Sequence, residues 1–320
     1  MSSSDARPRD AMSGAAAPRI AVLVPCYNEA LTIAGVVERF RAALPEALIY
    51  VYDNNSSDGT SEVARQAGAL VRTERRQGKG NVVRRMFADI EADIYVMVDG
   101  DDTYDALAAR RLVEELQAGP YDMVNVARAA ENEGAYRAGH ALGNKLLTGL
   151  VQRIFGTATA DMLSGYKAFS RRYVKSFPTM SSGFEIETEL VVHALDLRLP
   201  LSEITAPYKE RPAGSESKLR TYRDGFRILR LIGFLVKEER PLAFFSLVAG
   251  VLALVSLLIG TSVLIEFLAT GLVPRLPTAL LATGIMLSAL LSLSCGFILD
   301  TVTRGRREAK RLVYLQYPAP

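Results

Sequence analysis

Two aspartates separated by one glycine, Asp99 and Asp101, come directly after the apolar run Tyr95–Val98. An apolar run without alternation predicts a strand buried on both faces of a parallel sheet. Ligands of open α/β sheets bind beyond the carboxyl ends of the strands, so both carboxylates are expected where a ligand would bind. Such oxygen ligands suit Mg²⁺ or Mn²⁺, which usually completes its shell with substrate phosphates and water. The pair alone would favour a polar turn after the strand over a ligand site, and the rest of the chain reverses that preference.

Polar residues also follow the first three predicted strands, in the segments Pro25–Glu29, Asp53–Thr60 and Arg75–Gly80. Within the last of these, Lys79 lies between two glycines at the start of a predicted helix. This arrangement suits a diphosphate, because free backbone amides and the helix dipole attract anions. The chain has neither a GxGxxG nor a GxxxxGK[ST] motif, which argues against a dinucleotide-type Rossmann site and against a P-loop.

The elements that must position these residues alternate between strand and helix from about residue 20 to residue 127. Apolar runs that end in polar turns predict strands over residues 20–24, 48–52, 69–71, 94–98 and 123–127. Capping residues and helical periodicity predict helices over residues 28–40, with Asn28 as the cap, and over residues 60–67, 80–90 and 106–117. This alternation predicts an α/β fold with a doubly wound, mainly parallel sheet.

Apolar residues are concentrated near the carboxyl end of the chain, in segments 242–268 and 276–299. Each can cross a hydrocarbon core of about 30 Å, which needs roughly 20 helical residues, and the short connector predicts a transmembrane hairpin. Two buried helices of a soluble domain are the alternative, but core helices are rarely apolar on every face. Cations flank both outer ends, so the positive-inside rule predicts a multi-pass protein of the inner (cytoplasmic) membrane with its catalytic domain and both termini in the cytosol. We expect the cations after the second segment to meet anionic lipid headgroups.

Composition divides the chain into five segments. Residues 1–18 are rich in Ser, Ala and Pro and lack the apolar core of a signal peptide, which predicts a disordered tail. The others are a cytosolic domain (19–218), a juxtamembrane amphipathic region (219–240), the two spans (241–300) and a basic cytosolic tail (301–320). Arginines interleaved with apolar residues in the third segment favour interface helices, although a helix packed on the sheet would show the same pattern. The net charge of +3 is too small to indicate a nucleic-acid partner.

Eight short motifs occur in a fixed order along the cytosolic domain. They are VPCYNE (24–29), DNNSSDGT (53–60), QGKG (77–80), DGD (99–101), AR (127–128), DMLSGYKAF (161–169), GFEIETEL (183–190) and YKERPAGSESKL (208–219). In order and spacing they resemble the family-2 glycosyltransferases of GT-A fold. The resemblance is strongest to the polyprenyl-phosphate glycosyltransferases, the group of dolichyl-phosphate mannose synthase and bacterial undecaprenyl-phosphate sugar transferases. It implies a GT-A-type sheet followed by a membrane anchor.

The resemblance implies a nucleotide-sugar site. Its residues would be Pro25, Tyr27, Glu29, Asp53, Lys79, Asp99, Gly100, Asp101, Arg211 and Lys218. The first four correspond to positions that hold the base and ribose, and Lys79 would approach the diphosphate. Asp99 and Asp101 would bind Mg²⁺ or Mn²⁺, which bridges the donor diphosphate and offsets charge as the sugar leaves. Arg211 and Lys218 belong to a loop that closes over the donor in relatives.

The resemblance also implies a site for the acceptor phosphate. Arginine's planar fork suits phosphate oxygens, and Arg128 corresponds to the acceptor-phosphate arginine after the fifth strand. Arg137 and His140 are candidates for a second contact, and Ser217 of the closing loop is assigned to the same phosphate.

Acidic residues near this site leave the identity of any general base open. Asp161 corresponds to an acidic position proposed as a base in relatives, and it could equally order Arg128 or a nearby loop. Glu185 and Glu187 are further candidates. Because residues two apart on a helix do not share a face, at most one of these two glutamates should face the site. A phosphate acceptor is already anionic at neutral pH and needs less help from a base than a sugar hydroxyl would.

The resemblance implies inverting transfer of one sugar from a UDP- or GDP-linked donor to a polyprenyl phosphate, such as undecaprenyl phosphate, for cell-envelope glycan modification. The expected partners are donor, acceptor and lipid bilayer, and a homo-oligomer is compatible with the sequence. Another lipid acceptor is one alternative. A catalytically inactive membrane scaffold or sugar-nucleotide sensor is another, but it would be expected to lose a metal carboxylate, the loop lysine or the acceptor arginine. A processive polysaccharide synthase would carry a QxxRW motif, and this chain has no tryptophan.

Overall fold

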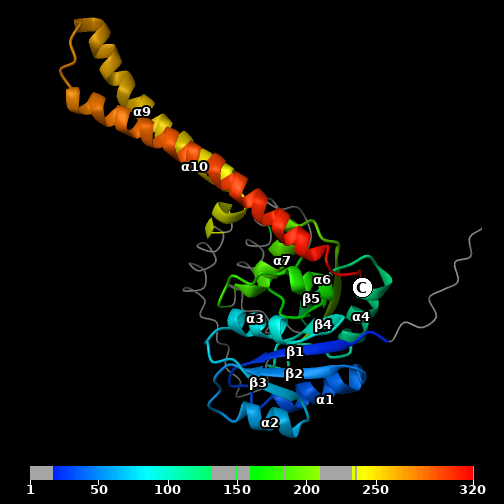
Figure 1. Cartoon of the computed structure of the whole chain (residues 1–320). Coiled ribbons are helices and arrows are strands. Elements are labelled where there is room, and N and C mark those ends of the chain that lie inside the picture. The colour runs from blue at the N-terminus through cyan, green and yellow to red at the C-terminus, as the bar shows by residue number, and fades with distance from the viewer. Residues whose placement is uncertain are drawn as a thin grey trace, which may run out of the picture.

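A seven-stranded sheet with helices on both faces forms the main domain of the computed structural model (Figure 1). The structure describes residues 17–130, 149, 159–183, 185–209, 233–234 and 236–319. Its strands are β1 (Ile20–Cys26), β2 (Leu48–Asp53), β3 (Leu70–Thr73), β4 (Ile94–Met97), β5 (Met123–Ala130), β6 (Lys167–Ser170) and β7 (Leu201–Tyr208). Their order is β3-β2-β1-β4-β6-β5-β7, and only β6 runs antiparallel to its neighbours. The predicted doubly wound, mainly parallel sheet is confirmed.

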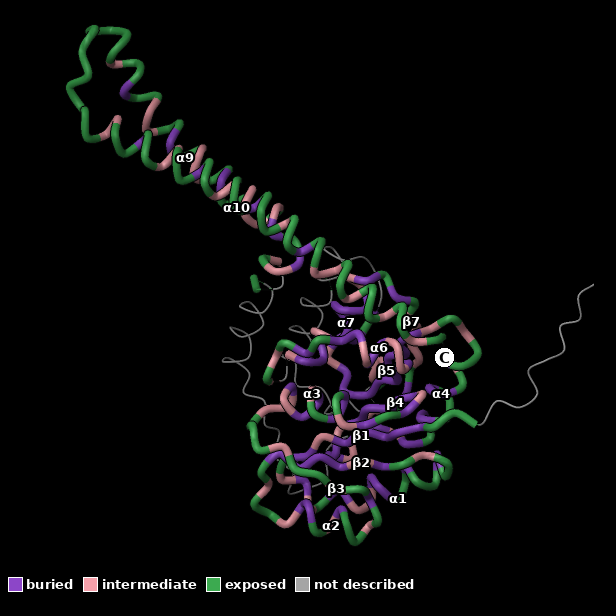
Figure 2. The backbone as a smooth tube through the Cα atoms, in the orientation of Figure 1, coloured by how far each residue is buried: buried purple, intermediate pink, exposed green. Residues whose placement is uncertain are grey.

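Two hydrophobic clusters cover the two faces of this sheet. The helices of the domain are α1 (Ile33–Ala43), α2 (Thr60–Gln66), α3 (Lys79–Asp89), α4 (Ala108–Ala118), α6 (Arg171–Ser176) and α7 (Ile186–Asp196). Val22 and Val24 of β1 face a cluster with α1, α2 and α4, whereas Leu23 faces a cluster with α3, α6 and α7. Successive side chains of a strand point to opposite faces, so burial on both faces explains why the run is apolar without alternation. In Figure 2 the central strands are buried along most of their length.

The first helix begins later than the sequence predicts. The predicted helix starts at a cap on Asn28, but α1 starts at Ile33. Asn28 has a left-handed φ of 53°, which a helix cap does not adopt. Its backbone N–H donates to Ser56 Oγ (2.8 Å), and its Oδ1 accepts from the backbone N–H of Ser57 (2.9 Å). Asn28 therefore ties together the loops after β1 and β2, and its assignment as a cap was wrong.

The antiparallel strand β6 was not predicted. It comes from the middle of the DMLSGYKAF motif and inserts between β4 and β5. It begins with Lys167 and ends with Ser170, so it lacks the continuous apolar run that marks the equally short β4. Its position brings the turn before it, including Gly165, beside the carboxyl end of β4: a Cβ on Gly165 would lie 2.2 Å from Asp99 Oδ2. Glycine permits this close approach.

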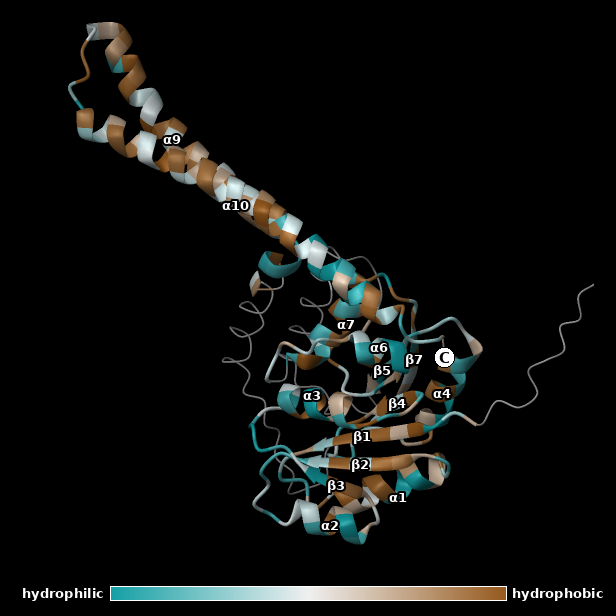
Figure 3. Ribbon diagram, in the orientation of Figure 1, coloured by the Kyte–Doolittle hydropathy of each residue, from teal (hydrophilic) through white to brown (hydrophobic). Residues whose placement is uncertain are grey.

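The two apolar segments form an antiparallel pair, α9 (Pro241–Thr270) and α10 (Leu276–Tyr314), which confirms that they make a helical hairpin. Both helices are long and apolar enough to cross a membrane. In the most apolar 18-residue stretch of each, only 11% of the residues of α9 and 17% of those of α10 are buried within the molecule. The hairpin projects away from the sheet domain with apolar residues on its outer faces (Figure 3). Ser256 Oγ donates to the carbonyl of Ala282 (2.7 Å) across the pair, a contact typical of helices that pack in lipid.

The second helix continues well beyond its apolar segment and packs against the sheet domain. Its last turn brings Tyr314 Oη to Asp122 Oδ2, where it donates a hydrogen bond of 2.7 Å. Arg307 pairs with Asp196 at the end of α7, and Lys310 Nζ lies 3.7 Å from the same carboxylate. These two cations therefore pair with the protein's own carboxylate, and the expectation that they meet lipid headgroups was wrong for them. Of the other predicted segments, residues 1–16 and most of 219–240 lie outside the described residues.

This contact predicts a stability effect far from the sheet's ligand-binding edge. The Asp196 side chain is 1% exposed, so the double replacement Arg307→Ala and Lys310→Ala leaves a buried carboxylate without a cation from the described part of the chain. Loss of the partners of a buried charge is expected to lower the free energy of unfolding by about 3 kcal/mol. The measurement is the thermal unfolding midpoint of the full chain in lipid nanodiscs.

A matched control is Arg304→Ala. Arg304 pairs with Asp300 on the same helix, and its side chain is 72% exposed, so its loss should change stability by less than about 0.5 kcal/mol. Equal midpoints for the double variant and the control would contradict a stabilising contact at Asp196. A chain cut after Arg240 would lose both Arg307 and Lys310, so the sheet domain alone is expected to be less stable than the full chain.

Candidate functional site

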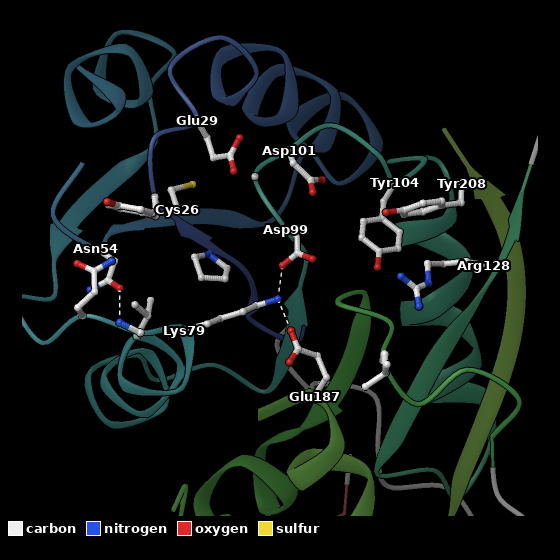
Figure 4. Close-up of a pocket in the computed structure, with 17 residues that line it drawn as sticks. Cys26, Glu29, Asn54, Lys79, Asp99, Asp101, Tyr104, Arg128, Glu187 and Tyr208 are labelled. Atoms are coloured by element: carbon white, nitrogen blue, oxygen red, sulfur yellow. Dashed lines mark hydrogen bonds and ion pairs between the residues drawn. The ribbon is translucent and has the colours of Figure 1, made fainter. Parts of the chain in front are cut away.

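A cavity of about 380 Å³ opens at the carboxyl ends of the strands, where open α/β sheets bind their ligands (Figure 4). Its lining comes from the loops after β1, β2 and β4, from the start of α3, and from β5, β7 and α7. Of the residues predicted from sequence, those that line it are Pro25, Tyr27, Glu29, Lys79, Asp99, Gly100, Asp101, Arg128 and Glu187. The other lining residues are Cys26, Asn54, Gln77, Gly78, Val82, Tyr104, Leu163 and Tyr208. The fold thus gathers most of the described candidate residues at one place.

Asn54 lines the cavity, whereas Asp53, the residue predicted from the sequence, does not. Asp53 is buried, its Oδ1 accepts from the backbone N–H of Ser56 (3.0 Å), and its Oδ2 accepts from Ser61 Oγ (2.7 Å). Asn54 Oδ1 accepts from the backbone N–H of Gly78 (2.7 Å). Asp53 therefore orders its own loop, while Asn54 holds the loop that precedes Lys79.

Lys79 is the first residue of α3 and lies at the floor of the cavity. Its side chain is 9% exposed, and its Nζ forms ion pairs with Asp99 and Glu187. Burial alone would lower the pKa of Lys79. The two carboxylates raise this pKa by a larger amount, so the net shift is upward and the ammonium stays charged. Gly78 has a φ of 124°, and a Cβ there would lie 2.1 Å from the carbonyl oxygen of Ser182. The glycine before Lys79 is therefore required by conformation and by space.

The two aspartates after β4 are held in different ways. Asp101 is buried, and its Oδ1 accepts from Thr103 Oγ1 (2.6 Å) and from the Thr103 backbone N–H (3.2 Å). Asp99 is more accessible, with a side-chain exposure of 26%. Between them, the Gly100 carbonyl accepts from Thr32 Oγ1 (2.7 Å), which anchors the turn to the start of α1. The turn is therefore rigidly attached to the sheet domain.

The described residues contain no group of three or more His, Cys, Asp or Glu side chains placed to hold a metal ion. Asp99 and Asp101 therefore offer a carboxylate pair and leave the rest of a coordination shell open. This donor set fits Mg²⁺ or Mn²⁺, since such ions are commonly bound by one or two carboxylates together with substrate phosphates and water.

Arg128 lies at the end of the cavity opposite Asn54 (Figure 4) and forms a bidentate ion pair with Asp161. Arg128 Nε lies 2.6 Å from Asp161 Oδ2, and Arg128 Nη2 lies 2.9 Å from Asp161 Oδ1. The guanidinium also lies 5.3 Å from the ring centroid of Tyr208. Because both oxygens of Asp161 accept from Arg128, the geometry favours a role for Asp161 in orienting the arginine over a role as a general base. Asp161 itself does not line the cavity.

The glutamates of the GFEIETEL motif are separated by the start of α7. Glu187 lies inside the helix and lines the cavity, whereas Glu185 precedes the helix and does not. Figure 4 shows Glu187 across the Lys79 ammonium from Asp99. The sequence identified Glu187 as an acidic candidate but did not indicate its pairing with Lys79, which depends on contact between two helices.

Two tyrosines that sequence reasoning missed shape the wall beside Arg128. The rings of Tyr104 and Tyr208 pack edge to face with centroids 5.2 Å apart. Tyr104 Oη accepts from the backbone N–H of Gly165 (2.8 Å) and so fixes the turn that borders Asp99. Both tyrosines occur next to or within recognised motifs, but an aromatic side chain alone gives no chemical signal in a sequence.

Five predicted site residues lie outside the described residues. They are Arg137, His140, Arg211, Ser217 and Lys218. Their assignments to the acceptor phosphate and to the closing loop stay predictions.

Comparison with known proteins gives a consistent family. The model of "Glycosyl transferase family 2" matches residues 21–177. Glycosyltransferase AglJ of Haloferax volcanii is 32% identical over 92% of this chain and 97% of its own. A dolichyl-phosphate hexose transferase of the same organism is 26% identical over 69% of this chain and 95% of its own. An undecaprenyl-phosphate 4-deoxy-4-formamido-L-arabinose transferase of Yersinia pestis is 23% identical over 74% of this chain and 72% of its own.

Solved structures share the fold of the sheet domain. Glucosyl-3-phosphoglycerate synthase of Mycobacterium tuberculosis, in complex with Mn²⁺, UDP-glucose and phosphoglyceric acid, superposes with a TM-score of 0.58. The match covers 69% of this chain and 79% of that chain at 23% sequence identity. At this identity the likeness supports the fold alone.

Proposed function

The chain belongs to glycosyl transferase family 2, and from this premise we propose that it transfers a single hexosyl group from a UDP- or GDP-linked sugar to a polyprenyl phosphate. The observation that carries the proposal is the composition of one cavity. It has a carboxylate pair and a largely buried lysine near its centre and an oriented arginine at one end, in a chain that also carries an apolar helical hairpin. Relatives named for dolichyl-phosphate and undecaprenyl-phosphate transfer support this acceptor class.

The donor half of the site would bind the nucleoside diphosphate. Asp99 and Asp101 would hold Mg²⁺ or Mn²⁺, which when bound offsets the charge that grows on the leaving diphosphate. The Mn²⁺ and UDP-glucose in the solved structure of a fold relative support this choice of ion and donor. Pro25, Tyr27 and Glu29 line the end of the cavity at β1, where the base and ribose would lie.

The acceptor half of the site would bind a lipid phosphate. Arg128 offers a planar guanidinium whose orientation is fixed by Asp161, and such a fork binds phosphate oxygens well. An anionic phosphate needs no base to become a nucleophile at neutral pH, which agrees with the engagement of both Asp161 oxygens. One phosphate oxygen forms a bond to the anomeric carbon, the bond from that carbon to the diphosphate breaks, and the nucleoside diphosphate leaves. Attack from the opposite side inverts the anomeric centre and gives a β-linked product.

The hairpin would place this reaction at a membrane surface. We infer that α9 and α10 span the cytoplasmic membrane and that the sheet domain lies on the cytosolic side, where nucleotide sugars are available. The excess of cations outside the connector supports this orientation. The product would then serve a glycosyltransferase that uses lipid-linked sugars for cell-envelope glycans.

The test is direct assay of the full chain in nanodiscs. The protein is incubated with Mn²⁺, undecaprenyl phosphate and one UDP- or GDP-linked hexose at a time. The masses of the lipid products are then measured by mass spectrometry. We expect a product heavier than the acceptor by one hexosyl residue, formed with one donor and lost in EDTA. Undecaprenol, which has no phosphate, is the matched control acceptor. Equal transfer to undecaprenol would contradict the acceptor class, and donor binding without any lipid product would favour a sugar-nucleotide sensor.

A further inference from the structure

The proposed donor site contains an internal conflict at Asp99. The carboxylate that would bind the metal is already paired with the Lys79 ammonium, and Lys79 is also the cation expected at the donor diphosphate. A divalent ion and an ammonium repel each other at short range, so both cannot use the same carboxylate oxygen. Lys79 bonds Asp99 Oδ1, and Oδ2 is closely approached by the chain at Gly165, so a metal at Asp99 would displace Lys79 from Oδ1.

Glu187 gives Lys79 a second partner that the metal site does not share. Lys79 Nζ donates to Glu187 Oε1 as well as to Asp99 Oδ1, and Figure 4 shows the ammonium between the two carboxylates. The Glu187 side chain is 6% exposed, against 26% for Asp99. Of the two partners, Asp99 faces the open cavity and Glu187 is the more deeply buried.

Glu187 in turn depends on Lys79. Its Oε2 is buried and has no hydrogen-bond partner among the described residues, and Lys79 is the one cation there that forms an ion pair with it. A buried carboxylate that lost its cation would cost several kcal/mol. The pair between Lys79 and Glu187 should therefore persist while the pair between Lys79 and Asp99 is exchanged.

We propose that Glu187 is a positioning residue that keeps Lys79 from competing with the divalent metal for Asp99. The permanent pair with Glu187 lets the ammonium turn from Asp99 to the donor diphosphate without leaving a buried charge unpaired. This inference rests on the proposed function, because it requires the metal at Asp99. It assigns to Glu187 a role that is not general base catalysis.

The test is a double-mutant cycle on Mn²⁺ binding to the full chain in nanodiscs, measured by the electron paramagnetic resonance signal of free Mn²⁺, without donor or acceptor. Without Glu187, Lys79 stays on Asp99, so we expect Glu187→Gln to raise the Mn²⁺ dissociation constant about tenfold. Lys79→Met should tighten Mn²⁺ binding much more in the Glu187→Gln background than in the native background. Glu185→Gln, which changes an acidic residue outside the cavity, is the matched control and should leave binding unchanged.

The cycle separates this inference from simple electrostatics. If Glu187 acted only through its charge at a distance, Lys79→Met would tighten binding by the same factor in both backgrounds, and that result would overturn the proposal. Glu187→Asp, which keeps the charge but withdraws it from Lys79, replaces Glu187→Gln if the latter does not fold, and the same non-additivity is expected. Mn²⁺ binding that does not respond to Asp99→Asn would instead overturn the metal site of the proposed function, and this inference with it.

Discussion

Replacing Asp99 by asparagine is expected to lower the rate of sugar transfer about 100- to 1,000-fold, the range for loss of a group that stabilises developing charge. Asparagine has nearly the same shape, so the close contact between Asp99 and Gly165 is kept. What is lost is one of the two carboxylate charges that would hold the metal beside the diphosphate. The measurement is the initial rate of lipid-linked sugar formation at saturating donor, with Mn²⁺ varied over a wide range.

Asp102 provides the matched control, because it follows Asp101 directly and carries the same charge. It pairs with Arg39 and does not line the cavity, so Asp102→Asn should change the rate by no more than about twofold, as for an exposed ion pair. Full activity of the native chain in EDTA would contradict the role of Asp99 in metal binding. So would equal losses in the Asp99 and Asp102 variants.

The parts of the fold that the sequence predicted are those with local signals. The strands β1, β2 and β4 are apolar runs that end in polar residues, and each was located to within a few residues. The helical hairpin was predicted because the length and hydropathy of its two segments are local properties of the sequence. The strand β6 escaped prediction because its position depends on pairing with β4 and β5, which are distant in the chain.

The site shows the same division between local and non-local information. Asp99, Lys79 and Arg128, which line one cavity, could be singled out because each is charged and lies where a strand ends or a helix begins. The choice between Asp53 and Asn54 was missed because successive residues at a strand end point to opposite sides, and the sequence does not say which side faces the ligand.

At the end of α10, two cations that the sequence assigns to the lipid surface have another partner in the structure. Cations after an apolar span are typical of the cytosolic side, and that pattern is present here. Nothing in the sequence indicates that Arg307 and Lys310 face a buried carboxylate on α7. The consequence is structural: α10 forms one arm of the apolar hairpin and continues without a break onto the sheet domain (Figure 1).

Replacing Arg128 by alanine is expected to reduce kcat/KM for undecaprenyl phosphate about 100-fold or more, the loss for truncating one member of a buried charge pair. Binding of the nucleoside diphosphate should change by less than about threefold, since Arg128 lies at the other end of the cavity from Asn54 (Figure 4). The measurements are a titration of the lipid acceptor at saturating donor and calorimetric binding of UDP and GDP. An equal loss of nucleotide binding would contradict the assignment of Arg128 to the acceptor.

Variants of Asp161, the ion-pair partner of Arg128, test whether this aspartate orients the arginine or acts as a general base. In Arg128→Ala the Asp161 carboxylate stays buried without its bidentate partner and would repel the incoming phosphate, so part of the loss comes from the aspartate that remains. The double variant Arg128→Ala and Asp161→Ala removes that repulsion and should therefore be more active than Arg128→Ala alone. Asp161→Asn alone should be milder than either, because an amide oxygen can still accept from the guanidinium. If Asp161 were the general base, the double variant would instead be no more active than Arg128→Ala, and Asp161→Asn would be as damaging as the loss of the arginine.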